Sequence, residues 1–348
     1  MDLFPLLYDA HRQTRRGKRE RREVVRFELD LGANLLRLSD QLSRGVYRPK
    51  PYTRFTIFEP KRREVFAPRY GDRVVQQALA DHVLKPTLEP RLIFDNAACR
   101  VGKGTDFALD RVTGFLRACF QRHGRDAFIL KYDIRRYFVS IDHDVLKAKL
   151  WRVFTNPKQR RLLEVIVDSY EAADGVGLPL GNQASQWFAL YYLDSLDRLI
   201  KERLRVPWYS RYMDDGVLIH PDKAYLRRCL AQMEEHVAGL GLEFNAKTQI
   251  FPVSAGVNYL GWHLYVTDTG KVVRRLDSAK KATLARHLGR MHEEHAAGEM
   301  SVDQLKQRLT SIGAHLERGN TWGLRRDLLH EHPWIRLRPS VSALSSFG

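Results

Sequence analysis

The sequence has no long apolar run, because no stretch approaches 18 consecutive apolar residues. Cysteine is scarce as well. The three cysteines share no metal-binding spacing and are odd in number (Cys99, Cys119, Cys229), which favours a reduced protein. The N-terminus shows neither a basic leader nor the apolar segment of a signal peptide. We therefore expect a cytoplasmic protein that does not associate with a membrane.

Negative charge is the scarcer kind: 41 Asp and Glu face 58 Lys and Arg, for a net charge of +17. Such an excess must face a polyanion, a membrane surface or solvent, and nucleic acid is favoured once membranes are set aside. Residues 11–26 concentrate eight Arg or Lys against two Glu. A solvated charged face and a nucleic-acid contact both remain open for this basic segment.

Apolar periodicity predicts an α+β chain in which helices pack on antiparallel strands, followed by a helical C-terminal part. We expect strands or hairpins at 52–60 with 63–70, at 127–134, at 208–220, and around a turn at 268–270. We expect helices at 27–45, 182–204 and 222–239, an irregular segment at 94–120, and further helices within 277–331. No internal repeat is evident.

Two adjacent acids, Asp214 and Asp215, lie inside the β-forming stretch "WYSRYMDDGVLIH". Asp-Gly is a common hairpin turn, so the pair could serve only to shape a turn. A third acid, Asp133, ends the expected strand "AFILKYD". Three carboxylates at neighbouring strand ends of a basic protein would suit two hard cations and the phosphates of nucleotidyl transfer.

Several motifs occur together in order and carry a resemblance to reverse transcriptases. "YMDD" at 212–215 resembles their active-site tetrapeptide, while 131–142 and 177–197 resemble their first two palm motifs. "LEFNAKT" resembles their lysine-bearing motif, and "YLGWHL" resembles their primer grip. Two further segments, "EPKRREVFAPRYGDRVVQQAL" and "FDNAACRVGKGTDFAL", resemble their fingers region. The likeness covers about residues 50 to 330.

The resemblance implies a right-hand polymerase with fingers, a palm built on an antiparallel sheet, and a helical thumb. The expected divisions are a basic N-terminal helical extension at 1–48, fingers at 49–125, a catalytic palm at 126–255, and primer grip and thumb at 256–348. It also implies an RNA-directed DNA polymerase that uses two Mg²⁺ ions, with Mn²⁺ as a substitute. Expected partners are template RNA, the RNA/DNA duplex and deoxynucleoside triphosphates.

Site residues are carried over position by position. The metal ligands would be Asp133, Ile134, Asp214 and Asp215, with Asp133 and Asp214 the most directly bound. The nucleotide-binding residues would be Lys61, Arg63, Phe138, Leu180, Gly181 and Gln186, where Phe138 matches the gate against a 2′-hydroxyl. Lys247 matches the lysine that could protonate pyrophosphate, and the primer grip would be Leu260, Gly261 and Trp262. Core packing for Phe138 and a surface position for Lys247 remain open.

Leu180 departs from the common pattern, because many reverse transcriptases have Gln there. An aliphatic side chain cannot donate the same hydrogen bonds, so nucleotide selection should weaken. Together with Ser185-Gln186, it resembles the reverse transcriptases of diversity-generating retroelements, which misincorporate opposite adenine. That subfamily implies a small, basic, oligomeric accessory protein. An antiphage defence enzyme and an inactive RNA-binding scaffold remain the alternatives.

Overall fold

The computed structural model describes residues 3–58, 63–170 and 172–335. The chain forms two compact units, each built from several segments. The first unit contains Met1–Gly104, Tyr132–Gly216 and Arg227–Gln249, and the second contains Thr105–Lys131, Val217–Leu226 and Ile250–Gly348. Within the described ranges, no helix combines the length and the apolarity needed to cross a membrane.

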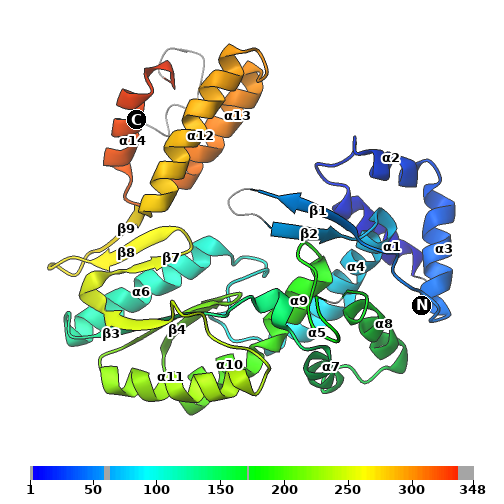
Figure 1. Cartoon of the computed structure of the whole chain (residues 1–348), viewed down its shortest axis with the longest axis horizontal. Helices are drawn as coiled ribbons and strands as arrows, with labels where there is room; N and C mark the ends of the chain where they lie inside the picture. Colours follow the sequence, from blue (N-terminus) through cyan, green and yellow to red (C-terminus); the bar gives the residue numbers. More distant parts are fainter. Residues whose placement is uncertain (1–2, 59–62, 171, 336–348) are drawn as a thin grey trace. The chain divides into compact units, whose positions relative to one another are not determined.

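The first unit begins with three helices and a hairpin (Figure 1). Strands β1 and β2 pair antiparallel, with Thr53 opposite Ala67 and Ile57 opposite Arg63, as the sequence predicts. The elements are α1 (Phe4–Thr14), α2 (Arg22–Glu28), α3 (Leu31–Ser43), β1 (Thr53–Ile57), β2 (Arg63–Ala67), α4 (Tyr70–Leu79), a π-helical segment (Ala80–Leu84) and α5 (Lys85–Leu88).

The helix expected at 27–45 is confirmed over Leu31–Ser43 but begins four residues later, because α2 ends at Glu28 and the helical path breaks at Asp30. Asp30, between α2 and α3, has φ −135° and ψ 48°, which lies outside the helical region. Each helix buries one side of itself in the same cluster, through Val24 on α2 and Leu35 on α3. The break lets two short apolar faces reach one core, which a continuous helix could not do.

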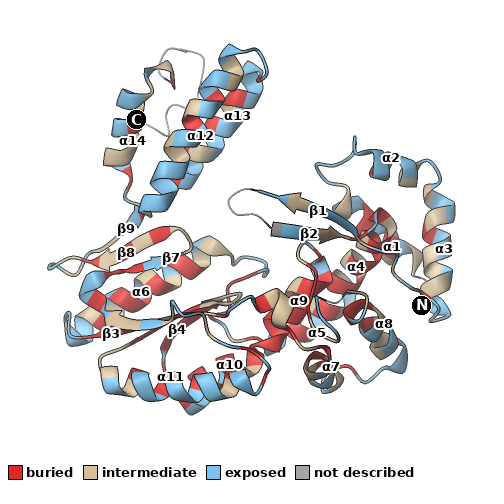
Figure 2. Cartoon of the chain, viewed as in Figure 1, coloured by how far each residue is buried: buried red, intermediate tan, exposed pale blue. Residues whose placement is uncertain are grey.

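The helix expected at 182–204 is also interrupted and is not amphipathic. It comprises α9 (Gln183–Tyr192), α10 (Asp194–Arg198) and a π-helical turn (Leu199–Arg203). Helix α9 contacts α4, α5 and α7, and all its residues except Gln183 and Gln186 are buried (Figure 2). Because α9 packs against neighbouring helices on several sides, it lacks the solvent-facing polar face that its periodicity predicts.

Four strands, β3 (Phe128–Asp133), β4 (Trp208–Tyr212), β5 (Asp215–His220) and β6 (Gln249–Pro252), form one sheet in the order β4-β5-β3-β6. The order places β3, which ends at Asp133, directly beside β5, which begins at Asp215. The expected strand and hairpin are both confirmed. Helices α7 (His143–Trp151), α8 (Pro157–Val167) and α11 (Lys223–Ala238) complete this part of the chain.

The second unit contains a long helix, α6 (Thr105–His123), which contacts β8 and β9. The expectation of an irregular segment at 94–120 is therefore wrong from Thr105 onward. Strands β7 (Val257–Tyr259), β8 (Trp262–Val266) and β9 (Val272–Leu276) form an antiparallel sheet, which confirms the hairpin turning at 268–270. Three helices follow: α12 (Ser278–Ala296), α13 (Val302–Leu316) and α14 (Trp322–Glu331).

Candidate active site

The hairpin β4–β5 carries the paired acids at its tip. Met213 and Asp214 connect the two strands, and Asp215 is already the first residue of β5. Met213 has a φ of +54°, a left-handed conformation that costs a non-glycine residue about 1–2 kcal/mol. The alternative that Asp-Gly itself forms the turn is therefore wrong, because the turn lies two residues earlier and both Asp215 and Gly216 belong to the strand.

Close packing against a neighbouring strand explains why residue 216 is a glycine. A Cβ atom there would lie 2.3–2.6 Å from Cζ, Cε1 and the hydroxyl oxygen of Tyr132 on the neighbouring strand β3. The Tyr132 ring is fully buried, and its hydroxyl shares a 2.7 Å hydrogen bond with the hydroxyl of Tyr209. The tyrosine therefore has no room to move, and only glycine allows β5 to lie this close to β3.

We expect Gly216→Ala to lower the free energy of unfolding by about 1–3 kcal/mol, the usual effect of overpacking a core, and to reduce activity because Asp215 is adjacent. Urea denaturation followed by circular dichroism measures the first effect. Gly289→Ala on α12 is the matched control, since a Cβ there meets nothing within 4 Å and alanine favours a helix. Equal stability of the Gly216→Ala variant and the wild type would contradict this account.

Asp133 lies next to the hairpin tip through main-chain hydrogen bonds. The N–H of Ile134 donates to the carbonyl oxygen of Asp214 at 3.3 Å. On the other side, Asn245 donates its main-chain N–H to the carbonyl oxygen of Asp133 at 2.7 Å and its Nδ2 to Asp133 Oδ2 at 3.2 Å. Asp133 is thus held between the turn at Met213 and Asp214 and the segment that contains Asn245. The sequence analysis missed Asn245, although "LEFNAKT" contains it.

A buried ion pair lies behind the tip. Arg211 and Asp197 both have side chains that are fully shielded from solvent, and two hydrogen bonds join them at 2.7 and 2.6 Å. Arg211 Nη1 also donates to the carbonyl oxygen of Met213 at 2.6 Å, and Nη2 donates to the carbonyl oxygen of Leu190 at 3.1 Å. Arg211 therefore connects the turn at Met213 to the buried Asp197 through hydrogen bonds.

The charge state of this pair follows from its surroundings. Burial alone would lower the pKa of the Arg211 guanidinium, but the charge of Asp197 and its hydrogen bonds hold that pKa well above its usual value. Burial, and then the negative charge of Asp197, raise the pKa of Tyr209, whose hydroxyl donates to Asp197 Oδ1 at 2.7 Å. Arg211 therefore keeps its positive charge. Sequence reasoning missed this pair, and the only signal was an arginine inside an apolar strand.

Phe138 and the loop that precedes α9 lie together. Phe138 is half-buried in a single 3-10 turn, and its carbonyl oxygen accepts a 2.7 Å hydrogen bond from the N–H of Leu178. Leu180 is half-buried in the same loop. Gly181 has a φ of +90°, and a Cβ there would lie 3.8 Å from Val65 Cγ1 on β2. The structure thus brings Phe138, the Leu180 loop and the β1–β2 hairpin together.

Gln186 is half-buried and is, with the exposed Gln183, one of the two accessible residues of helix α9. Its Oε1 accepts a 3.2 Å hydrogen bond from the thiol of Cys99. Burial raises the pKa of that thiol to about 11, so the proton is present at neutral pH and the thiol can donate. Gln186 therefore joins α9 to the segment after α5.

Three further predicted site residues are lysines or arginines, and the structure describes them to different extents. Lys61 lies outside the described residues, and only the main chain of Arg63 is placed, at the start of β2. Lys247 is exposed, and its N–H donates to Asn245 Oδ1 at 3.1 Å. One asparagine thus contacts both Asp133 and the main chain of the predicted general acid.

The predicted primer grip belongs to the second unit. Leu260 and Gly261 connect β7 to β8 with φ values of +51° and +85°, as in a type I′ hairpin turn. Trp262 is buried, with its ring centroid 5.3 Å from that of His315 on α13. The turn residues are accessible, whereas Trp262 packs in the interior of the unit.

The donors at the tip fit a hard divalent cation. Asp133, Asp214 and Asp215 offer carboxylates, while Ile134 has a buried apolar side chain and so could contribute only its main-chain carbonyl. Across the described part of the chain, no three His, Cys, Asp or Glu side chains are grouped to hold a metal ion by themselves. Mg²⁺ commonly takes one or two protein carboxylates and completes its shell with water and substrate phosphate. The donor set therefore suits an ion that arrives with a nucleotide.

Solved structures share this fold. A telomerase from Candida albicans in complex with a TWJ fragment of telomeric RNA aligns with a TM-score of 0.52 and 13% identity, over 86% of this chain and 55% of that chain. An apo telomerase from Candida tropicalis, truncated from its C-terminal domain, aligns with a TM-score of 0.50 and 13% identity, over 69% of this chain and 59% of that chain. The chain spans under two thirds of either telomerase. The fold is that of a right-hand polymerase.

The sequence profile described as "Reverse transcriptase (RNA-dependent DNA polymerase)" matches residues 59–264. That range is more than half of the chain and includes the β4–β5 hairpin, Asp133 and the Leu180 loop. The protein therefore belongs to the reverse transcriptase family. No curated protein matches the sequence.

Proposed function

We propose that the protein is an RNA-directed DNA polymerase whose metal ligands are Asp133, Asp214 and Asp215. The observation that carries the proposal is the hydrogen bond from the N–H of Ile134 to the carbonyl oxygen of Asp214. It joins two motifs that are far apart in the sequence at one edge of the sheet. A divalent ion bound there, in our proposal Mg²⁺, would lower the pKa of a primer 3′-hydroxyl and neutralise charge on the pyrophosphate.

In this proposal, the other predicted site residues bind the incoming nucleotide, the leaving pyrophosphate and the primer strand. Phe138 lies against the sugar of the incoming nucleotide, and the Leu180 loop contacts its base pair. The exposed Lys247 reaches the leaving pyrophosphate as a proton donor. Lys61 and Arg63 bind the triphosphate, where the planar guanidinium of Arg63 suits a bidentate contact. The primer grip at Leu260 and Gly261 positions the primer strand.

Primer extension tests the proposal directly. The purified protein is incubated with an RNA template, a labelled DNA primer, deoxynucleoside triphosphates and Mg²⁺, and products are resolved by length. We expect DNA synthesis that chelation of divalent ions abolishes. RNA binding without synthesis, under every metal and primer tried, would instead support the inactive scaffold.

We further propose that synthesis is error-prone, in the manner of diversity-generating retroelements. The support is Leu180, an aliphatic residue where a hydrogen-bonding Gln is common, and Ser185-Gln186, of which only Gln186 is accessible. The proposed partners are a structured template RNA and a small, basic, oligomeric accessory protein. A defence enzyme could share this palm. A near-duplicate template and variable repeat beside the gene would favour the retroelement, and their absence would favour defence.

We expect Leu180→Gln to lower misincorporation opposite template adenine by about fivefold, the effect of one restored hydrogen bond of about 1 kcal/mol. Deep sequencing of complementary DNA made from a defined RNA measures the error rate at each template base. Leu180→Met, which keeps an aliphatic side chain of similar size, should leave the spectrum as in the wild type. An unchanged spectrum in the Gln variant would remove Leu180 as the cause.

A further inference from the structure

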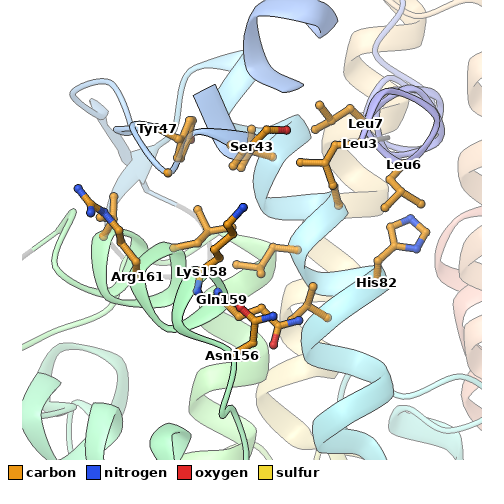
Figure 3. Close-up of a pocket in the computed structure, with 18 of the residues that line it drawn as sticks. Leu3, Leu6, Leu7, Ser43, Tyr47, His82, Asn156, Lys158, Gln159 and Arg161 are labelled. Carbon is orange, nitrogen blue, oxygen red and sulfur yellow. Dashed lines mark hydrogen bonds between the residues drawn. The ribbon is translucent and has the colours of Figure 1, made fainter. Parts of the chain in front are cut away.

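A cavity of about 520 Å³ lies within the first unit (Figure 3), and none of the proposed catalytic and nucleotide-binding residues that the structure describes lines it. Its walls come from α1, from the end of α3 and the segment that follows, from α4 with the π-helical turn after it, and from α8. Its volume falls in the range of about 300–1,000 Å³ that is usual for small-molecule sites.

The interior of the cavity is aliphatic. Leu7, Val75 and Leu79 are buried there, and Leu3 and Leu162 are half-buried, so apolar surface remains in contact with water. Removing such surface from water contributes roughly 25 cal/mol per Å². The interior therefore favours the apolar part of a ligand.

The rim of the cavity is cationic. Arg48, Lys158 and Arg161 line it and are exposed, and no Asp or Glu is among the lining residues that the structure describes. None of the three forms an ion pair with a carboxylate in the described ranges. Figure 3 shows Lys158 and Arg161 on the α8 side, opposite the leucines of α1. The cations are thus available to an anion at the mouth.

We propose that this cavity binds an anionic amphiphile, with its apolar chain among the leucines and its carboxylate or phosphate at Arg48, Lys158 and Arg161. Nucleic acid is the less suitable occupant, because its bases need aromatic surfaces on which to stack, whereas leucine and valine side chains provide most of the interior. The one tyrosine in the wall, Tyr47, is buried, and its hydroxyl already donates to Asp72 Oδ1 at 2.8 Å. The ligand could come from free fatty acids or from lipid headgroups, which share this chemistry.

Isothermal titration calorimetry of the full chain with monomeric decanoate tests the proposal. We expect one site with a dissociation constant on the order of 10–100 µM, which is reasonable for a ligand of this size. Decyltrimethylammonium, with the same chain length and a positive head, should bind at least about tenfold more weakly, because its head meets like charge.

Variants locate the site. Arg161→Glu should weaken decanoate binding about tenfold or more, whereas Arg12→Glu, an exposed position on α1 that does not line the cavity, should leave it unchanged. Ala78→Phe, which fills the cavity from α4, should abolish binding. Thermal unfolding of each variant separates loss of the site from loss of the fold.

Four results of these experiments would each contradict the proposal. The proposal fails if decanoate does not bind, if the cationic amphiphile binds as tightly, if Arg161→Glu and a folded Ala78→Phe bind like the wild type, or if a short RNA displaces decanoate from this site. Vesicles of phosphatidylglycerol, compared with phosphatidylcholine, identify the source. Binding to anionic vesicles that requires Arg161 points to lipid headgroups, and binding of monomeric decanoate alone points to free carboxylates.

Discussion

Asp214→Asn is expected to reduce primer extension by about 10³-fold or more, with little change in the free energy of unfolding. The side chain is half-buried at the hairpin tip, so the amide fits the same space. The substitution removes a negative charge from the proposed metal site, and a bound ion supplies several kcal/mol of transition-state stabilisation. Extension of a labelled primer at saturating nucleotide measures the change.

Asp144→Asn is the matched control for this effect. Asp144 lies on α7 with its side chain 94% exposed, 3.2 Å from Lys147, and we expect wild-type extension rates from its variant. If the Asp214→Asn variant extended primers as fast as the wild type, the proposed metal site would be wrong. Loss of activity in both variants would point to an effect of negative charge in general.

The second large effect concerns the buried ion pair. Asp197→Asn is expected to lower the free energy of unfolding by about 3–5 kcal/mol, because the charge of Arg211 would stay buried without its carboxylate. Denaturation in urea measures this loss. Asp194→Asn, on the same helix, is the comparison: Asp194 pairs with Arg198, whose side chain is 44% exposed, so water can solvate the remaining charge and a smaller loss is expected.

A double variant separates the structural contribution of this pair from its contribution to the catalytic turn. Arg211→Met combined with Asp197→Leu replaces both charges by apolar groups, which is often neutral or stabilising. We expect stability to recover substantially relative to Asp197→Asn. We expect primer extension to stay low, because the carbonyl oxygen of Met213 would have lost its arginine donor. Recovery of both properties would show that Arg211 contributes only to the fold.

Much of the site could be predicted from sequence because its motifs are short and local. The residues of "YMDD" lie on one hairpin, and the strand that ends at Asp133 is a continuous apolar run, so each element could be recognised by itself. The exact turn could not be predicted from the Asp-Gly pair. Met213 occupies the left-handed position, and Gly216 is required by the ring of Tyr132, which is a contact between strands.

Errors in the fold prediction arose where a helix is surrounded by other elements. The periodicity of 182–204 suggested one amphipathic helix, yet α9 is buried nearly all round and the helical path changes at Leu193. In 94–120, glycines and charged residues concealed α6, whose buried face includes Leu109, Val112 and Leu116. Periodicity reports one contact face, so it is a poor guide when a helix such as α9 has several. The buried residues of α6 recur at helical spacing, so the signal for that helix was present in the sequence and was missed.

Composition and local patterns were enough to predict the class of this protein: an α+β, strongly basic chain with three acids in ordered polymerase motifs. Those properties reside in composition and in local patterns, which need no partner elements. How the acids are held depends on packing, through Asn245 beside Asp133 and through Arg211, which pairs with Asp197 and donates to the carbonyl oxygen of Met213. Such contacts join residues distant in the chain, and a buried charge acquires its partner only when the helices and strands pack together.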